Sequence, residues 1–363
     1  SPNKLKALLN TFKPQIVGIT AVTMTFEPAI KVISDVKRIN PEIITVMGGP
    51  HVSFCARQTL ADNPELDIIA LGEGENTIVE LSREAEGRQN WDAVKGIAFR
   101  RDSEICFTPE REFIRDLDTL PTPARHLLPM GRYRALGMPV SLTTSRGCPY
   151  KCIFCVGRKM VGARVRYRSP QHVVDEMEYL NTLNFHQINI ADDLFTANKG
   201  HCMAVCDEII NRNLQLKWTS FARVDTISET VLNRMKAAGC TAVSFGIESA
   251  NPEILKTIKK GITTQHVVDA VEMCHRAGVI PFGSFILGLP GETRHDMLET
   301  AEIIANLPID GLKLHLLYVI KGTPLEKMYQ KGRFRCLSQA EYIDLVCDFL
   351  ERLPPRMIIQ RLT

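Results

Sequence analysis

Apolar segments of strand length alternate with segments of helical periodicity along almost the whole chain. In the N-terminal part, strands are expected at 15–23, 43–51 and 66–75, and a helix between the first two at 28–39. Apolar runs without polar alternation are typical of parallel strands buried on both faces, with helices as the connections between them. The sequence therefore predicts an α/β fold that begins with a doubly wound, Rossmann-like parallel sheet.

A second series of strand–helix units begins near residue 138 and supplies six expected strands. Such a repeat predicts a partial (β/α)6 barrel, with its active site at the carboxyl ends of the strands. A proline-containing stretch without a clear period, at 111–129, reads as a connector. The predicted organisation is an N-terminal domain over 1–110, a linker over 111–137, a barrel over 138–335 and a C-terminal helical segment over 336–363.

Composition narrows the class of protein. The chain has 363 residues, of which 45% are hydrophobic and 23% charged, and 44 basic residues oppose 41 acidic ones. We find no long basic run, membrane span or signal peptide, so neither nucleic acid nor a membrane is expected as a partner. Eleven cysteines, an odd number, fit a reducing cytoplasm better than a disulfide scaffold. Both ends read as internal sequence, so we expect a piece of a longer protein with an incomplete first domain.

Three cysteines lie within eight positions, in the segment RGCPYKCIFC. Cys148, Cys152 and Cys155 follow the first barrel strand, which places them at the functional end of the barrel. Three thiolates on a [4Fe–4S] cluster leave one iron without a protein ligand, and an open metal position can bind a substrate. The alternatives are a zinc site with a distant fourth ligand, or three unrelated core thiols. The compact spacing, with no fourth thiol nearby, favours the cluster.

The segment CPYKCIFC, with Phe154 before the last cysteine, resembles the cysteine loop of the radical S-adenosyl-L-methionine (SAM) enzymes. The resemblance implies that Cys148, Cys152 and Cys155 bind a [4Fe–4S] cluster. It further implies that the amino and carboxylate groups of SAM chelate the fourth iron, and that an electron from the reduced cluster cleaves SAM to a 5'-deoxyadenosyl radical. Phe154 is expected to contact SAM.

The resemblance extends over nearly the whole chain. GITAVTMTFEPA, VMGGPHVSF and LGEGE resemble the segments that hold the corrin and its nucleotide tail in cobalamin-dependent radical SAM enzymes, the class B methylases. Read from the residues alone, glycines at strand ends either turn the chain or let the backbone approach a flat ligand. The Asp-x-His-x-x-Gly motif that supplies a cobalt ligand in many cobalamin proteins does not occur here. The candidate cobalamin contacts are Thr20, Thr23, Thr25, Gly48, Gly49, His51, Gly72 and Glu73.

Two further barrel strands end in charged residues. Asp192 and Asp193 follow the second strand, where the family contacts the amino group of SAM; the alternative for either is a helix N-cap. Arg223 follows the third strand and is a candidate partner of the SAM carboxylate. Its alternative is an ion pair with Asp225 or another neighbour.

The fourth and fifth strands complete the predicted SAM site. The resemblance implies that Glu248 holds the ribose hydroxyls, with Ser249 as an adjacent candidate. Gly288, in FILGLPGET, is a candidate for backbone contact with adenine, although the segment also fits a plain tight turn.

The leading functional hypothesis is an enzyme that cleaves SAM reductively and transfers a methyl group, through cobalamin, to an unactivated carbon. A cyclase or rearrangement enzyme without methyl transfer is the alternative within this class, and a non-catalytic cobalamin- or cluster-binding sensor is the alternative outside it. The resemblance implies a small-molecule or natural-product substrate and an electron donor of the flavodoxin or ferredoxin type.

Overall fold

The computed structural model describes residues 2–102 and 104–362 and divides into two compact units, Ser1–Ile114 and Arg115–Thr363. Each unit has its own sheet and its own hydrophobic core. Residues 115–137, which the sequence assigned to a linker, fall in the second unit.

The N-terminal unit is built on a five-stranded sheet in the order β1-β2-β3-β4-β5. The first three strands pair in parallel, which confirms the predicted arrangement, whereas the β4–β5 hairpin adds an antiparallel edge that the sequence analysis did not anticipate. The strands are β1 (Ile16–Thr20), β2 (Ile44–Gly48), β3 (Ile68–Ala70), β4 (Ile97–Arg101) and β5 (Glu104–Phe107). The helices are α1 (Pro2–Phe12), η1 (Thr23–Thr25), α2 (Phe26–Ile39), α3 (Pro50–Asp62), α4 (Glu75–Glu86) and η2 (Trp91–Ala93).

Both faces of this sheet are buried because successive side chains of a strand point to opposite faces. Met47 of β2 and Ile69 of β3 pack in one cluster with residues of α2 and α3. Their neighbours Val46 and Ile68 pack in another cluster with Leu81 of α4. Full burial of each such side chain stabilises the fold by about 1.5–3 kcal/mol.

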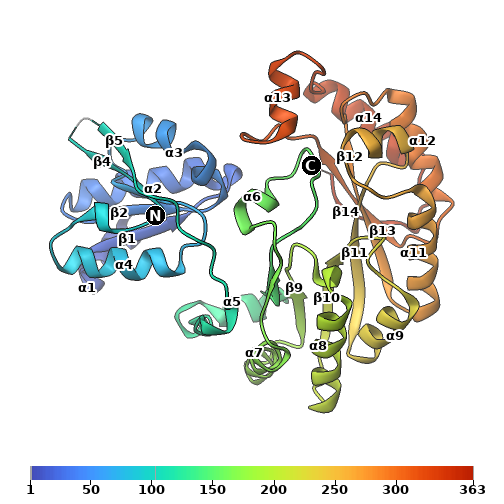
Figure 1. Ribbon diagram of the computed structural model, residues 1–363, viewed down its shortest axis with the longest axis horizontal. Helices are drawn as coiled ribbons and strands as arrows, with labels where there is room; N and C mark the ends of the chain where they lie inside the picture. The colour runs from blue at the N-terminus through green and yellow to red at the C-terminus, as the bar shows by residue number, and fades with distance from the viewer. Residues whose placement is uncertain (1, 103, 363) are drawn as a thin grey trace. The chain divides into compact units, whose positions relative to one another are not determined.

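The second unit is built on a seven-stranded parallel sheet in the order β14-β13-β12-β11-β10-β9-β6. The sheet curls, with helices along its outer face, and this half-barrel confirms the predicted partial barrel (Figure 1). The six expected strands are present. The seventh, β14, is an edge strand in the segment that the sequence analysis assigned to helix, and all four of its residues are exposed. The strands of this sheet are β6 (Val140–Leu142), β9 (Gln187–Ile190), β10 (Lys217–Ala222), β11 (Cys240–Glu248), β12 (Ile280–Leu287), β13 (Gly311–Leu316) and β14 (Ile358–Arg361). A separate antiparallel pair is formed by β7 (Ser145–Arg146) and β8 (Arg166–Tyr167).

Helices cover the outer face and end where capping residues predict. Ser169 accepts a hydrogen bond from the backbone of His172 at the start of α7, and Gly278 ends α11 in the left-handed conformation. The helices are η3 (Leu117–Thr119), η4 (Arg125–Leu127), α5 (Met130–Ala135), α6 (Gly157–Val161), α7 (Pro170–Thr182), η5 (Phe195–Ala197), α8 (Lys199–Asn211), α9 (Glu229–Ala237), α10 (Pro252–Thr257), α11 (Thr264–Ala277), α12 (Arg294–Ala305), α13 (Pro324–Gln330) and α14 (Gln339–Glu351).

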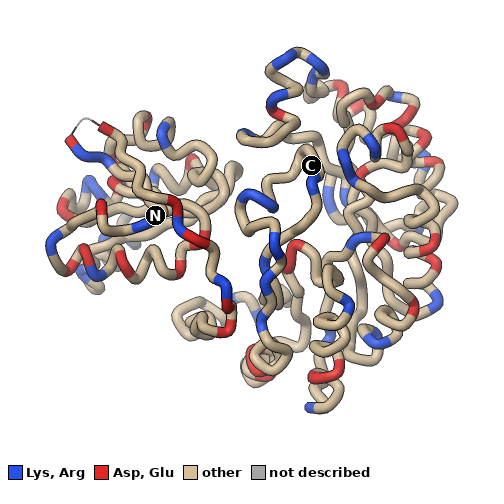
Figure 2. Tube along the Cα trace, viewed as in Figure 1, with Lys and Arg blue, Asp and Glu red and all other residues tan. Residues whose placement is uncertain are grey.

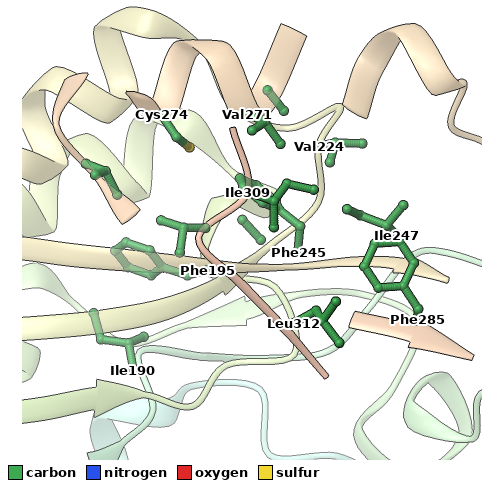
Figure 3. Close-up of a cluster of buried hydrophobic side chains, with 14 of the residues drawn as sticks. Ile190, Phe195, Val224, Phe245, Ile247, Val271, Cys274, Phe285, Ile309 and Leu312 are labelled. Carbon is green, nitrogen blue, oxygen red and sulfur yellow. The ribbon is translucent and has the colours of Figure 1, made fainter. Parts of the chain in front are cut away.

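The core of this unit lies between the sheet and its helices. Phe245 of β11 and Phe285 of β12 pack with Val271 of α11 in one buried cluster (Figure 3). The neighbouring strand residues Ser244 and Ser284 point the other way and line a cavity on the concave face. Strand alternation therefore fills the outer face with apolar side chains and leaves the inner face free for a binding site.

Charged residues of both signs are spread over both units (Figure 2). Within residues 2–102 and 104–362, the longest helices have 14 residues, and none is long and apolar enough to cross a bilayer. A helix needs about 20 residues to span the hydrocarbon core.

Candidate functional site

A cavity of about 490 Å³ opens at the carboxyl ends of the barrel strands. All three cysteines of the predicted loop line it, in the segment between β7 and α6. The strand ends bring most of the other predicted SAM residues to the same cavity, as expected for a barrel. These residues are Phe154, Asp192, Asp193, Arg223 and Glu248.

The cysteine loop is held by its backbone. Gly147 has φ +119°, and a Cβ atom there would lie 2.5 Å from the carbonyl oxygen of Arg164, so the loop requires glycine at this position. Further along, the Ile153 amide donates to the carbonyl of Ile258 at 3.1 Å, and the Ile153 carbonyl accepts from the Leu325 amide at 3.1 Å. The loop is therefore tied to two distant segments of the same unit.

The arrangement of the thiols fits a multi-iron cluster. All three cysteines are free, and no three His, Cys, Asp or Glu side chains in residues 2–102 and 104–362 converge as ligands of one metal ion. A zinc site brings four ligands to about 2.0–2.3 Å of one ion. Three thiols around one cavity suit a [4Fe–4S] cluster, because its irons are held by separate cysteine thiolates. Burial raises the pKa of the Cys152 thiol, while the charges of Lys260 and Arg223 lower it and so favour the thiolate.

The two aspartates after β9 have different environments. Asp192 is buried and accepts three hydrogen bonds of 2.6 Å, from the Thr144 amide, the Thr144 hydroxyl and the Ser145 hydroxyl. Its carboxylate therefore joins the ends of β6 and β9. Asp193 is exposed, lines the cavity and accepts a hydrogen bond from the Gly147 amide at 3.3 Å. Asp193 is the better placed of the two to accept a hydrogen bond from an ammonium group.

Arg223 adopts the alternative that the sequence left open, an ion pair with Asp225. Its Nε and Nη2 each donate to a separate carboxylate oxygen of Asp225 at 2.9 Å. Nη2 also donates to the Lys260 carbonyl at 2.8 Å, and the guanidinium stacks 3.6 Å from the ring centre of Tyr150. This contact joins the third strand to the cysteine loop while one face of the cation still lines the cavity.

Glu248 has a cationic partner that the sequence analysis missed. The Lys260 Nζ donates to Glu248 Oε1 at 2.7 Å, and both side chains are buried and line the cavity. Glu248 adopts φ +72°, which side chains other than glycine rarely adopt, and such strain is common at functional sites. The pair places a carboxylate and an ammonium group side by side in the cavity wall.

Ser249 and Gly288 are placed elsewhere. They do not line this cavity but bind Glu292: the Ser249 hydroxyl donates at 3.2 Å, and the Gly288 and Leu289 amides donate at 3.0 Å. Burial raises the pKa of Glu292 to about 7, against the effect of these hydrogen bonds. These hydrogen bonds stabilise the turn after β12. The predicted SAM contacts at Ser249 and Gly288 stay predictions.

The candidate cobalamin residues gather at one edge of the N-terminal sheet, because the carboxyl ends of parallel strands meet there. Gly49 has φ +102°, and a Cβ atom there would lie 2.6 Å from the Ala21 carbonyl oxygen. His51 contacts Thr23, with Nδ1 3.1 Å from Oγ1, and stacks on Phe26. The others lie at or just after the strand ends: Thr20 and Gly48 end β1 and β2, Thr25 ends η1, and Gly72 and Glu73 follow β3.

The same edge exposes apolar side chains and accessible backbone. Val22 and Met24, between β1 and α2, are 48% and 86% exposed, and a Cβ atom at Gly72 would meet nothing within 4 Å. Exposed apolar side chains beside accessible backbone suit a large, flat ligand with apolar faces. Glu73 is already engaged, since its Oε2 accepts from the Ile114 amide at 2.8 Å.

A half-barrel with three thiols around its upper cavity, joined to a Rossmann-like domain, defines the class of radical SAM proteins with a corrin-binding domain. Comparison with known families agrees. The Radical SAM superfamily matches residues 142–304, the Radical SAM C-terminal domain matches 309–363, and the B12 binding domain matches 1–82.

Known proteins similar to this chain fall in the same class. "Uncharacterized methyltransferase PH0819" of Pyrococcus horikoshii is 37% identical over 320 residues, which are 88% of this chain and 70% of that protein. The anaerobic magnesium-protoporphyrin IX monomethyl ester cyclase of Rubrivivax gelatinosus is 33% identical over 312 residues, which are 83% of this chain and 56% of that protein. The structure of the radical SAM methyltransferase TsrM from Kitasatospora setae, with cobalamin and a [4Fe–4S] cluster bound, has a TM-score of 0.82 at 19% identity and covers 99% of this chain and 85% of that one. At this identity it shows the shared fold.

The chain belongs to the radical SAM superfamily and carries a B12-binding domain. This confirms the predicted family, the predicted enzyme class and the predicted cofactors, namely a [4Fe–4S] cluster, SAM and cobalamin. The relative from Pyrococcus horikoshii is named a methyltransferase, and the relative from Rubrivivax gelatinosus is named a cyclase.

Proposed function

We propose that this protein transfers a methyl group from SAM, by way of cobalamin, to an unactivated carbon of a small organic molecule. One observation carries the proposal: three cysteines, Asp193 and the Glu248–Lys260 pair line a single cavity at the carboxyl ends of the half-barrel. When bound, the cofactors supply the chemistry, the reduced cluster cleaving SAM and cobalamin carrying the methyl group. The residues of the chain bind, orient and exclude water.

Each polar group of the cavity has a role that follows from its charge. The three thiolates hold the cluster and leave one iron for SAM. Asp193 accepts a hydrogen bond from the SAM ammonium group, and Glu248 accepts from the ribose hydroxyls. Lys260, beside Glu248, holds that carboxylate in position through its hydrogen bond of 2.7 Å. Phe154, at the last turn of the cysteine loop, provides an apolar contact on the same wall.

The substrate is proposed to be a small molecule. A volume of about 490 Å³ lies in the range of about 300–1,000 Å³ that is usual for small-ligand sites. Electrons for the cluster are proposed to come from a flavodoxin- or ferredoxin-type protein, because the reaction begins with a one-electron reduction that no group of the chain supplies.

Ring formation without methyl transfer is the second candidate. It is favoured by the relative from Rubrivivax gelatinosus that is named a cyclase and is 33% identical over 83% of this chain. Both reactions need the cluster and SAM. They differ in whether the methyl group of SAM is transferred to the product.

The experiment that tests the proposal uses anaerobically reconstituted protein with cobalamin, a chemical reductant and SAM labelled with ¹³C in its methyl group. We expect 5'-deoxyadenosine in wild type and none in Cys152→Ala. With a substrate present, the ¹³C label appears in the product. A product that forms without the label would support the cyclase instead, and no 5'-deoxyadenosine in fully reconstituted protein would support the sensor.

A further inference from the structure

A second cavity, of about 610 Å³, lies on the concave face of the half-barrel below the cysteine loop. It shares Phe221 and Ser244 with the upper cavity. On β13, Lys313 lines the lower cavity and His315 lines the upper one, and residues two apart on a strand are separated by about 7 Å. A molecule of moderate size can therefore occupy both cavities at once.

The lower cavity is lined by neutral hydrogen-bonding groups and one cation. Its polar lining includes Gln187, Asn189, Thr219, Thr241 and Gln360, and none of its described lining residues is acidic. The Ser244 Oγ is buried and has no hydrogen-bond partner among the described residues. An unpaired buried hydroxyl is unfavourable, and a hydrogen bond with a ligand offsets this cost.

The cation is the ammonium group of Lys313. It forms no ion pair or hydrogen bond with a described residue, and its Nζ lies 5.3 Å from the ring centre of Phe221. Arg361 is its partner across the β13–β14 pairing, so a second positive charge is near. Burial and the charge of Arg361 both lower the pKa of Lys313, whereas the negative charge of a bound anion would raise it.

Apolar groups complete the walls on one side. Phe221, Phe282 and Ile280 line the cavity beside Lys313. A ligand with an anionic end and an apolar or aromatic body would satisfy the cation, the unpaired hydroxyl and the aromatic walls together.

We propose that the lower cavity binds the anionic end of the substrate, a carboxylate or phosphate-type oxyanion, on Lys313, while the reacting carbon extends past Phe221 and Ser244 into the upper cavity. The inference rests on the proposed function, and it names the substrate class as an organic anion. It also makes Lys313 a specificity-determining residue that lies outside the SAM site.

The test uses the anaerobically reconstituted protein after reductive dimethylation of its lysines with ¹³C-formaldehyde and a borane reductant, which preserves their charge and gives each lysine an NMR signal. Phenylphosphonate is the anionic probe and benzyl alcohol the neutral probe of similar size. The Lys313 signal is assigned as the one that is absent in Lys313→Arg. We expect its chemical shift to change in a saturable way when phenylphosphonate is added, and to stay unchanged when benzyl alcohol is added. The signal of Lys256, which is 80% exposed on α10, is expected to stay in place.

Calorimetric titration of unmodified variants measures the contribution of the charge. Lys313→Met is expected to weaken phenylphosphonate binding about tenfold, as the loss of a charge-assisted hydrogen bond implies, whereas Lys313→Arg and the control Lys256→Met retain it. Circular dichroism and the absorbance of the cluster check that each variant is folded and loaded. Equal shifts of all lysines, equal binding of benzyl alcohol, or unchanged affinity in Lys313→Met would overturn the inference.

The readout is independent of the catalytic assay. Cleavage of SAM without saturable anion binding at Lys313 would overturn this inference alone. Saturable binding at Lys313 without cleavage of SAM would support the inference and count against the proposed function.

Discussion

The Lys260 Nζ donates a hydrogen bond of 2.7 Å to the Glu248 Oε1, and the two buried groups form an ion pair in the wall of the upper cavity, which the three loop cysteines also line. Glu248 ends β11, whereas Lys260 comes from the segment between α10 and α11. The pair therefore connects the position expected to hold the ribose of SAM to a loop outside the sheet. Breaking a buried pair leaves one charge without compensation.

The first prediction separates the stability of this pair from its function. Lys260→Met and Glu248→Gln are each expected to lower the free energy of unfolding, Lys260→Met by about 3–5 kcal/mol, because a buried charge is left unpaired. The double variant is expected to lose less than the sum, measured by urea unfolding, because neither charge remains. SAM affinity, measured by equilibrium dialysis, is expected to stay low in the double variant. Recovery of SAM binding there would show that Glu248 serves stability alone.

A second prediction concerns the space around the pair. A Cβ atom at Gly246 would lie 2.6 Å from Glu248 Oε1 and 2.9 Å from Lys260 Nζ, so Gly246→Ala must displace the pair. We expect SAM affinity to fall by about tenfold, the cost of one charge-assisted hydrogen bond, while the far-ultraviolet circular dichroism stays native. Gly131→Ala in α5, where a Cβ atom meets nothing within 4 Å, is the control. Equal affinity in the two variants would contradict the assigned geometry.

The third prediction concerns the cluster. Cys148→Ala, Cys152→Ala and Cys155→Ala are each expected to lose iron and acid-labile sulfide after anaerobic reconstitution, together with the visible absorbance band. Each thiolate holds a separate part of the cluster, so one loss is sufficient. Cys347→Ala, which removes an exposed thiol of α14, is expected to keep the full content. Retention of the cluster by any of the three loop variants would require a different ligand.

The fourth prediction tests the cobalamin surface. Gly49→Ala introduces a Cβ atom 2.6 Å from the Ala21 carbonyl and 2.7 Å from Thr20 Oγ1, at a residue with φ +102°. We expect the ends of β1 and β2 to shift, at a cost of about 1–3 kcal/mol in stability, and less hydroxocobalamin to remain bound after gel filtration. Gly18→Ala on β1 has open space around its Cβ and serves as the control. Equal retention of the corrin band in both variants would place the ligand elsewhere.

The fifth prediction is a pH dependence. Burial raises the pKa of Glu292 from 4.5 to about 7. Between these two pH values the folded protein keeps the Glu292 carboxyl protonated, whereas the unfolded chain has already released this proton. The contribution of this proton to stability is complete below about pH 4.5, declines as the pH rises to about 7 and is lost above it. Glu292→Gln keeps an acceptor for the Gly288 and Leu289 amides and is expected to remove the decline.

The measured quantity is the difference in unfolding free energy between Glu292→Gln and wild type. It is expected to change in favour of the variant by up to about 3 kcal/mol between pH 4.5 and pH 8, since one pKa unit corresponds to about 1.4 kcal/mol. Glu253→Gln, at an 80% exposed position of α10, is expected to give no such trend. A difference that is independent of pH would show that Glu292 titrates normally.

Local patterns were sufficient to predict the two sheets and the cysteine loop. Continuous apolar runs, without polar alternation, predicted parallel strands that are buried on both faces. The compact spacing of Cys148, Cys152 and Cys155 predicted that they share one site. The edge strand β14 was missed because all four of its residues are exposed, so it carries no pattern of burial.

The partners of the site residues could not be read from spacing, because they are made by tertiary contacts. Lys260 reaches Glu248 only after the chain turns through α10, and the two hydroxyls that hold Asp192 lie nearly fifty residues before it. In the turn after β12, the Gly288 amide donates to the half-buried Glu292, a partner that no sequence motif indicates.

The central claim is that the three cysteines leave one iron of the cluster free for SAM. Electron–nuclear double resonance on the reduced protein, with SAM labelled with ¹⁵N in its amino group and ¹⁷O in its carboxylate, tests this most directly. The account predicts hyperfine coupling of both labels to the cluster, and its loss in Cys155→Ala. A spectrum that SAM does not change, or one that shows a fourth side chain of the protein bound to the iron, would contradict it.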